Sequence, residues 1–300
     1  MSALHEARAL VTSLGTRPEI ISLADGVTVL ATPKTTVPLG GVLKPNLAVV
    51  LQGTKRAVLG THVYEYGSAQ LLAVGVDLPL TSSITAASTT EPFLAFGMAL
   101  QPEIIADLLL EAPALARRGR RVEGPVGLAM GDADDELLDV IVRLLRSVRS
   151  AHDYRVLGPG ILRELHWRLL SGPQGHVIRE LGSIDSRRSV VDRAVRWLQD
   201  NFDGPLRVDE LARSVDVSPA TLNRHFRAVT TMSPLQYQKT LRLQRARIML
   251  LAAHDDVSRV GYAVGYGSAS QFSREYRRMF GAPPSQDAEL LRHADVTIEA

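Results

Sequence analysis

The sequence predicts an α+β protein: a β-rich N-terminal domain with a helical extension, then an all-α domain of two helix-turn-helix motifs joined by a linking helix. Three observations predict this order. Strand-like segments recur roughly every 8 to 12 residues up to about Leu100, helical periodicity follows Gln101-Pro102, and the last third contains an internal repeat. With 300 residues, 45% of them hydrophobic, the chain can form two domains with separate cores.

The composition excludes several classes of protein. The chain has no cysteine, which excludes disulfides, thiolate nucleophiles and thiol-based sensing. Its apolar runs are far shorter than the ~20 residues of a membrane span, so we expect no membrane contact. Residues Met1 to Glu6 lack the basic and apolar stretches of an export signal. We therefore expect a cytoplasmic protein.

The strand-like segments lie between about residues 18 and 100. Turn residues separate them, namely Asp25-Gly26, Gly53, Gly60 and Gly67-Ser68. The segment from Lys55 to Tyr66 has the pattern of a hairpin with Gly60 at its tip. This rhythm predicts a β-sandwich or a small barrel.

Helical periodicity characterises about residues 102–182. One helix is expected to begin near Asp134, with acidic residues in its first turn, and a second to span about Ile161 to Leu170. A shorter helix then runs to Leu181. The first helix has an apolar stripe, either domain core or partly a dimer seam, made of Leu137, Leu138, Ile141, Leu144, Leu145 and Val148. The polar residues 183–189 are the expected linker between the domains.

The internal repeat has a spacing of 50 residues. The matched pairs are Ser218/Ser268, Leu222/Phe272, Arg224/Arg274, Phe226/Tyr276, Arg227/Arg277 and Pro234/Pro284. Just upstream, Val208 to Val215 matches Val257 to Val264 at a spacing of 49. Two copies of one small motif are therefore present.

Each copy has the residue pattern of a helix-turn-helix. A large apolar residue precedes a small one in the first helix, Leu211-Ala212 in one copy and Val260-Gly261 in the other, and the small residue lets a second helix cross closely. Ser218 and Ser268 are expected to cap the second helices. We place the motifs at about residues 207–228 and 256–280, within a domain spanning 190–292.

The outer faces of the two second helices combine arginine with small polar side chains. Arginine can bond guanine through two hydrogen bonds, and asparagine or glutamine can do the same with adenine. The candidate DNA-binding residues are Ser218, Ala220, Thr221, Asn223, Arg224, Arg227, Ser268, Ala269, Ser270, Gln271, Ser273, Arg274 and Arg277. The linking helix, Leu235 to Leu250, spans ~24 Å, so the module is expected to reach two successive major grooves.

Charge supports the same interpretation. Residues 218–281 carry ten basic and three acidic side chains, whereas residues 1–186 carry 17 basic and 19 acidic ones. A basic module indicates a polyanionic partner. A solvated helical face is the alternative that charge alone leaves open.

The segments Val264 to Tyr276, Phe280 to Pro284 and Ser233 to Tyr237 resemble the DNA-binding domain of the AraC/XylS family of bacterial transcription regulators. The resemblance covers about Val190 to Leu290. It implies a sequence-specific regulator that binds double-stranded promoter DNA, acts with RNA polymerase and is not an enzyme. The chain departs from the family pattern at Gly261, where alanine is usual.

The front of the chain resembles the AraC-type regulator N-terminal domain. The resemblance rests on Pro45 to Gly53, Tyr64 to Gly67, Val76 to Pro79 and Glu91 to Phe93. It implies a cupin-like barrel and helices within residues 1–182 that bind a small effector of unknown identity and form a homodimer. The candidate pocket residues are Lys44, Val49, Leu51, Tyr64 and Tyr66, and the two tyrosines are alternatively ordinary core.

Two rival hypotheses remain. A metal-dependent cupin enzyme would need a cluster of histidine and glutamate ligands, but His62 is alone in its strand, and Glu65 and Glu91 do not have the required spacing. We expect no metal and no cofactor, and no phosphate loop, dinucleotide motif or nucleophile elbow is present. The second rival is an interaction protein without a ligand, controlled by its abundance or by a partner.

Overall fold

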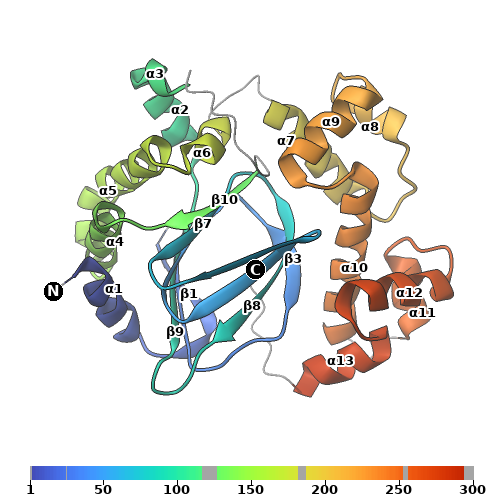
Figure 1. The fold of residues 1–300 in the computed structure, drawn as a ribbon, viewed down its shortest axis with the longest axis horizontal. Helices are drawn as coiled ribbons and strands as arrows, with labels where there is room; N and C mark the ends of the chain where they lie inside the picture. The colour runs from blue at the N-terminus through green and yellow to red at the C-terminus, as the bar shows by residue number, and fades with distance from the viewer. Residues whose placement is uncertain (1, 25, 117–126, 182–186, 253–255, 294–300) are drawn as a thin grey trace.

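The computed structural model describes residues 2–24, 26–116, 127–181, 187–252 and 256–293. Figure 1 shows helices of the N-terminal half on one side of a β structure and the C-terminal helices on the other. The predicted α+β class, with a β-rich domain followed by a helical one, is confirmed.

The strands form two antiparallel sheets. They are β1 (Arg17–Ala24), β2 (Val27–Thr32), β3 (Leu39–Leu43), β4 (Asn46–Gln52), β5 (Thr54–Leu59), β6 (His62–Gly67), β7 (Gln70–Val74), β8 (Leu78–Ala86), β9 (Phe93–Ala99) and β10 (Leu128–Asp132). One sheet has the order β1-β2-β9-β4-β7-β10 and the other β3-β8-β5-β6. The expected hairpin is confirmed: β5 pairs with β6, and Gly60 takes a positive φ of 61° at the tip.

Strand β10 corrects the expectation that residues 102–182 are purely helical. It lies at the edge of the six-stranded sheet and pairs with β7 from Leu128↔Val74 to Asp132↔Gln70. Five residues with a glycine at the fourth position carry little strand pattern. The backbone ladder to β7 decides their conformation.

Six helices of the described N-terminal half flank the strands. They are α1 (Ala3–Thr12), α2 (Pro102–Glu111), α3 (Pro113–Ala116), α4 (Asp135–Ser147), α5 (Ala151–Ser171) and α6 (Gly175–Leu181). The expected start of α4 is confirmed, because Asp134 accepts a hydrogen bond from the Leu137 amide at 2.8 Å. Five of the six residues in its apolar stripe are buried in the core, and Val148 is half-buried. The domain-core interpretation is therefore confirmed for these five residues.

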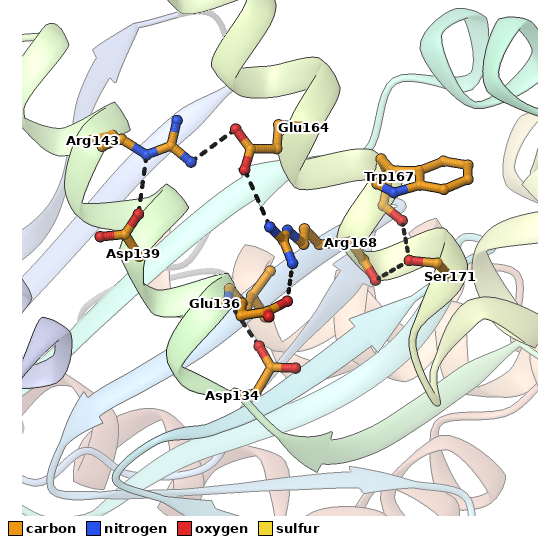
Figure 2. Close-up of polar contacts among 9 residues, drawn as sticks. Asp134, Glu136, Asp139, Arg143, Glu164, Trp167, Arg168 and Ser171 are labelled. Atoms are coloured by element: carbon orange, nitrogen blue, oxygen red, sulfur yellow. Dashed lines mark hydrogen bonds and ion pairs between the residues drawn. The ribbon is translucent and has the colours of Figure 1, made fainter.

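Helix α5 begins ten residues earlier than the predicted Ile161, because Pro159 does not end it. Ser150 caps the helix by accepting from the Asp153 amide at 3.2 Å, and exposed Pro159 removes only one internal donor. Figure 2 shows ion pairs between α4 and α5: Arg143 binds Glu164 at 2.8 Å, and Arg168 binds Glu136. These pairs tie the two helices together across their exposed rims.

The C-terminal helices are α7 (Arg187–Asp200), α8 (Val208–Ser214), α9 (Pro219–Thr230), α10 (Pro234–Ala252), α11 (Val257–Ala263), α12 (Ala269–Phe280) and α13 (Pro284–His293). Helix α10 is the expected linking helix. Of the expected linker 183–189, residues 183–186 lie outside the described residues and 187–189 already belong to α7.

Three hydrophobic clusters organise the chain. The first lies between the six-stranded sheet and helices such as α4 and α5. The second fills the space between the sheets and continues without a break into α7, α8, α9 and the front of α10. The third is confined to the back of α10 and helices α11 to α13, with Phe202 packed against it. The two sheets, together called the barrel below, therefore share one core with the first helix-turn-helix.

His166 on α5 is a fully buried polar residue in the first cluster. Its Nε2 accepts from the Gln101 amide at 3.0 Å, so the ring is the tautomer whose Nδ1 donates to the Leu162 carbonyl at 2.7 Å. Burial lowers the pKa of His166 below its usual range. The ring is therefore neutral in the folded protein.

This lowered pKa predicts a loss of stability in mild acid. The unfolded histidine titrates near pH 6.5, so the neutral-state contribution is full above that pH and falls as the pH drops below it, by up to about 1.4 kcal/mol per pH unit. The melting temperature measured from about pH 8 to about pH 5 should decline less steeply in His166→Gln than in wild type. His152→Gln, an exposed change in the same helix, should keep the wild-type slope, and identical slopes in all three would contradict this account.

Candidate nucleic-acid interface and effector cavity

Each predicted motif forms a helix-turn-helix in the structure, α8 with α9 and α11 with α12. The small residue in each first helix lies at the crossing point, as expected. Ala212 is 1% exposed, and a Cβ at Gly261 would lie 2.9 Å from Cδ1 of Phe272. The second helices, called recognition helices below, therefore cross their partners at close range.

The two copies repeat at the level of single hydrogen bonds. The Val217 amide donates to the Ala212 carbonyl at 3.1 Å, and the Tyr266 amide donates to the equivalent Gly261 carbonyl at 3.0 Å. At the other end, Thr231 and Gly281 both take positive φ angles and close α9 and α12. The internal repeat of the sequence is thus a repeat of structure.

The N-caps differ between the copies. Ser218 accepts from the Thr221 amide at 3.2 Å, which confirms the first expected cap. Ser268 occupies the N-cap position of α12, but its side chain forms no capping hydrogen bond. The second cap was wrongly predicted, because position in the motif does not fix the serine rotamer.

Solvent reaches most of the candidate DNA-binding residues. Exposed side chains are Ser218, Ala220, Arg224, Arg227, Ser268, Ser270, Gln271, Arg274 and Arg277, and half-exposed ones are Thr221, Asn223, Ala269 and Ser273. The side chains of the four arginines form no hydrogen bond or ion pair with the residues that the structure describes. Four unpaired guanidinium groups on two helices are a surface suited to a polyanion.

The two amide side chains are already engaged within their own helices. Asn223 donates through Nδ2 to the Pro219 carbonyl at 3.0 Å, and Gln271 donates through Nε2 to Glu275 at 3.2 Å. Each amide keeps a second N–H for another acceptor, but the bond it already makes fixes its orientation. The four arginine side chains form no such bond with described residues, which leaves them free to reorient toward a base.

Glu275 anchors α12 to the linking helix. Its carboxylate accepts from Lys239 on α10 at 2.8 Å and from the Tyr266 hydroxyl at 3.0 Å. Burial alone would raise the pKa of Glu275, but the bonds from Lys239, Gln271 and Tyr266 lower it below its usual range. The ionised carboxylate therefore fixes α12 against α10.

Helix α10 carries the two motifs at opposite ends (Figure 1). Its 19 residues span ~28 Å. The N-terminal half of the helix packs with the first motif, and the C-terminal half packs with the second. Arg278, exposed on α12 beside Arg277, adds a cation outside the predicted set, although its position one turn after Arg274 was a usable signal.

The five candidate effector residues do not form one pocket. Val49 and Leu51 are fully buried and face the helical layer. Tyr66 points into the core between the sheets, with Tyr64 packed against it. Buried side chains such as Tyr66 pack the space between the sheets, and a hollow of about 10 Å³ lies among residues such as Lys55 and Ser83.

A larger cavity, of about 190 Å³, lies where the barrel meets the C-terminal helices. Its lining residues are Val42, Lys44, Asp77, Gln199, Phe202, Leu241 and Arg245. Of the five candidates, only Lys44 lies there. The other six come from segments far apart in the chain, so no sequence pattern could have grouped them.

The cavity combines apolar walls with two unpaired cations. Asp77 also lines the cavity; its carboxylate accepts from Gln199 at 3.0 Å and offsets one of the two positive charges. Lys44 and Arg245 form no ion pair with the described residues, and the Arg245 guanidinium lies 5.2 Å from the centre of the Phe202 ring. A small molecule with a negative charge and an apolar body matches this lining.

Among the described residues, no group of three or more His, Asp or Glu side chains is placed to hold a metal ion, and His62 is exposed on β6. No helix among the described residues is long and apolar enough to cross a membrane.

The linking helix α10 joins two helix-turn-helix units, and an N-terminal domain of two sheets and flanking helices precedes them. This is the architecture of a two-domain transcription regulator. The chain belongs to the family of AraC-type transcriptional regulators. The family model for the AraC-type transcriptional regulator N-terminus matches residues 24–177, and a helix-turn-helix domain model matches residues 211–289.

Curated relatives agree with this assignment. The chain is 30% identical over 156 residues to the HTH-type transcriptional regulator ArgR of Pseudomonas aeruginosa, covering 52% of this chain and 46% of the relative. It is 32% identical over 111 residues to the HTH-type transcriptional activator RhaS of Pectobacterium carotovorum, covering 37% and 38%. The matches thus span less than half the length of these relatives.

Solved structures of ToxT from Vibrio cholerae share the fold. One has a TM-score of 0.55 at 10% identity and covers 88% of this chain and 97% of ToxT. A second, of wild-type ToxT with bound unsaturated fatty acid, has a TM-score of 0.51 at 11% identity and covers 91% and 96%. The likeness therefore extends over both domains.

The turn of the second motif generates a stability prediction. Gly265 has a φ of 86°, and a Cβ there would lie 2.0 Å from the Asp203 carbonyl oxygen, so Gly265→Ala adds a backbone clash to conformational strain. We expect a loss of about 2 to 4 kcal/mol in free energy of unfolding by urea titration. Gly281→Ala, with the same φ but open space, should lose only about 1 kcal/mol, and equal losses would contradict the close contact.

Proposed function

We propose that this protein is a sequence-specific DNA-binding transcription regulator that works in the cytoplasm and controls promoter activity in response to a small molecule. The observation that carries the proposal is the pair of recognition helices with four unpaired arginines, held at the two ends of α10. Family membership supports it. Arg224 and Arg274 are the proposed base contacts, and Arg227 and Arg277, one turn further along, the proposed phosphate contacts.

The first test is binding to the DNA upstream of the protein's own gene. Titration with salt, against an unrelated duplex, should give selective binding whose affinity falls steeply as salt rises, because phosphate contacts release counterions. Equal affinity for both duplexes would contradict operator recognition at this site.

A substitution separates base contact from phosphate contact. Arg274→Ala should weaken binding to the selected duplex by about 1 to 3 kcal/mol and leave binding to the unrelated duplex nearly unchanged, because a guanine contact carries sequence information. The matched control is Arg292→Ala, an exposed arginine on α13 outside both recognition helices. An equal loss on both duplexes in a fluorescence-anisotropy titration would identify Arg274 as a phosphate contact instead.

We propose further that the effector binds in the cavity between the barrel and α10, with Lys44 and Arg245 holding a carboxylate. Support comes from the two unpaired cations beside apolar Val42, Phe202 and Leu241, and from the fatty acid bound to the ToxT neighbour. The cavity is smaller than the ~300 Å³ at which ligand pockets usually begin. A long ligand would therefore have to move the barrel relative to α10, which would couple binding to the arrangement of the domains.

Thermal shifts with monocarboxylates from benzoate to oleate test this site. A saturable rise in melting temperature is expected for wild type, and it should shrink in Lys44→Met and Arg245→Met because each removes a charge partner. Arg155→Met, an exposed change on α5, should behave as wild type. An undiminished shift in both cavity variants would place the ligand elsewhere, and no shift with any carboxylate would favour control by abundance or by a partner.

Two partners belong to the same proposal: a second copy of the chain and RNA polymerase. The homodimer is supported by an apolar surface on α5, where Val156 and Leu157 are 66% and 54% exposed. These two adjacent side chains form a small exposed apolar surface that a second copy of the chain would cover.

A further inference from the structure

The barrel and the second helix-turn-helix share one buried guanidinium group, that of Arg247 on α10. Arg247 is 5% exposed. Its Nε and Nη2 donate to the two carboxylate oxygens of Asp287 on α13, at 2.8 and 2.9 Å, while its Nη1 donates to the Pro38 carbonyl in the segment between β2 and β3. A single side chain therefore bonds to both domains.

Asp287 extends this contact to the recognition helix α12. Its Oδ2 also accepts from the hydroxyl of Tyr276, a fully buried residue of α12, at 2.7 Å. The Arg247 guanidinium lies 4.4 Å from the centre of the Phe280 ring, and Phe280 packs on Tyr276 at 4.6 Å. Because a buried ion pair is stable only when its donors and acceptors are satisfied, this group tolerates few arrangements.

The two motifs are attached to the barrel in different ways. The first shares the barrel's hydrophobic core, and the Gly127 amide also donates to the Val229 carbonyl of α9 at 3.2 Å. The core of the second motif contains no described barrel residue. Its half of α10 contacts the barrel through polar groups: Gln244 donates to the Leu80 carbonyl at 3.2 Å, and Arg247 to that of Pro38.

These polar contacts are easier to break than the apolar core. The Gln244 Oε1 atom is buried with no hydrogen-bond partner among the described residues, which makes the docked arrangement less favourable. Separation of the back of α10 from the barrel would hydrate that oxygen and remove the Pro38 partner of Arg247. Separation of the first motif would instead expose a continuous core.

We infer that Arg247 is a positioning residue through which the N-terminal domain sets the orientation of the second recognition helix, α12, while the first, α9, moves with the barrel. The inference deepens the proposed function, because it assigns control by the N-terminal domain to one of the two motifs. Because coupling between two sites is reciprocal, a change in the position of α12 alters the free energy of docking between the barrel and α10 by the same amount.

Gly40 on β3 offers a way to disturb the docking from the barrel side. A Cβ at Gly40 would lie 2.7 Å from Cγ of Gln244, and none of its nearest neighbours belongs to α12 or α13. In hydrogen exchange on the full-length protein, Gly40→Val should raise amide exchange severalfold in α12 and α13 and leave α9 unchanged. Unchanged exchange in α12, or an equal rise in α9, overturns the inference.

Controls separate positioning from general destabilisation. Gly160→Val puts the same side chain in open space on α5 and should leave both motifs unchanged. If circular dichroism shows that Gly40→Val does not fold, Gln244→Ala replaces it, because it removes the Leu80 bond without a steric clash.

A double variant tests Arg247 itself. Arg247→Lys keeps a positive charge near Asp287 but loses the planar group that bonds both oxygens and Pro38 together. If Arg247 transmits the effect of Gly40→Val to α12, Gly40→Val causes no further rise in α12 amide exchange on the Arg247→Lys background. Additive effects overturn the role of Arg247.

DNA supplies an independent measurement. On a duplex that wild type selects from a random pool, Gly40→Val should lose base discrimination at the half-site under α12 and keep it under α9. Uniform loss at both half-sites overturns the inference. Failure of wild type to select any duplex contradicts the proposed function instead, and the exchange experiment, which needs no DNA, still decides the inference.

Discussion

The packing of α10 against the barrel is the contact on which the rest of the arrangement depends. Tyr237, near the start of α10, is fully buried, packs edge-on against Phe226 of α9 at 5.4 Å and donates its hydroxyl to the Asp77 carbonyl at 2.9 Å. One side chain thus links the linking helix, the first recognition helix and the barrel. Because a helix of 19 residues is stiff, the contacts of Tyr237 also fix the position of the second motif, which packs on the C-terminal half of α10.

The arginines of the C-terminal domain divide into two kinds with different physical roles. Arg242 donates to the backbone carbonyls of Phe202, Asp203, Gly204 and Gly265, and Arg247 is buried against Asp287. These two hold the turns and helices together. Arg224, Arg227, Arg274 and Arg277 have no side-chain partner in the described part of the chain and are free for a polyanion. The positive charge available to DNA is therefore smaller than the net charge of the domain, because Arg242 and Arg247 are bonded within the fold.

Because side chains pack the space between the sheets, the larger cavity lies at the junction of the barrel with the C-terminal helices. Tyr66, Leu72 and Phe93 belong to the core that fills the space between the sheets. The junction cavity is lined by Lys44 of the N-terminal domain and Arg245 of α10, so a ligand there would contact both domains at once. A ligand in that position can favour one arrangement of the domains over another, which a ligand enclosed by one domain can do only indirectly.

Local patterns in the sequence determined the elements and the recognition faces. The 50-residue repeat predicted both motifs, the pairing of large and small residues predicted their crossings, and the hairpin around Gly60 followed from its flanking segments. These features depend on neighbours within a few turns, so periodicity and turn chemistry suffice. The early start of α5 and the strand β10 escaped prediction because a tolerated proline and a backbone ladder leave no such pattern. The tertiary structure alone decided that Lys44 and Arg245 line one cavity and that Arg247 donates to the Pro38 carbonyl, because the docking of two domains brings together residues about 200 positions apart.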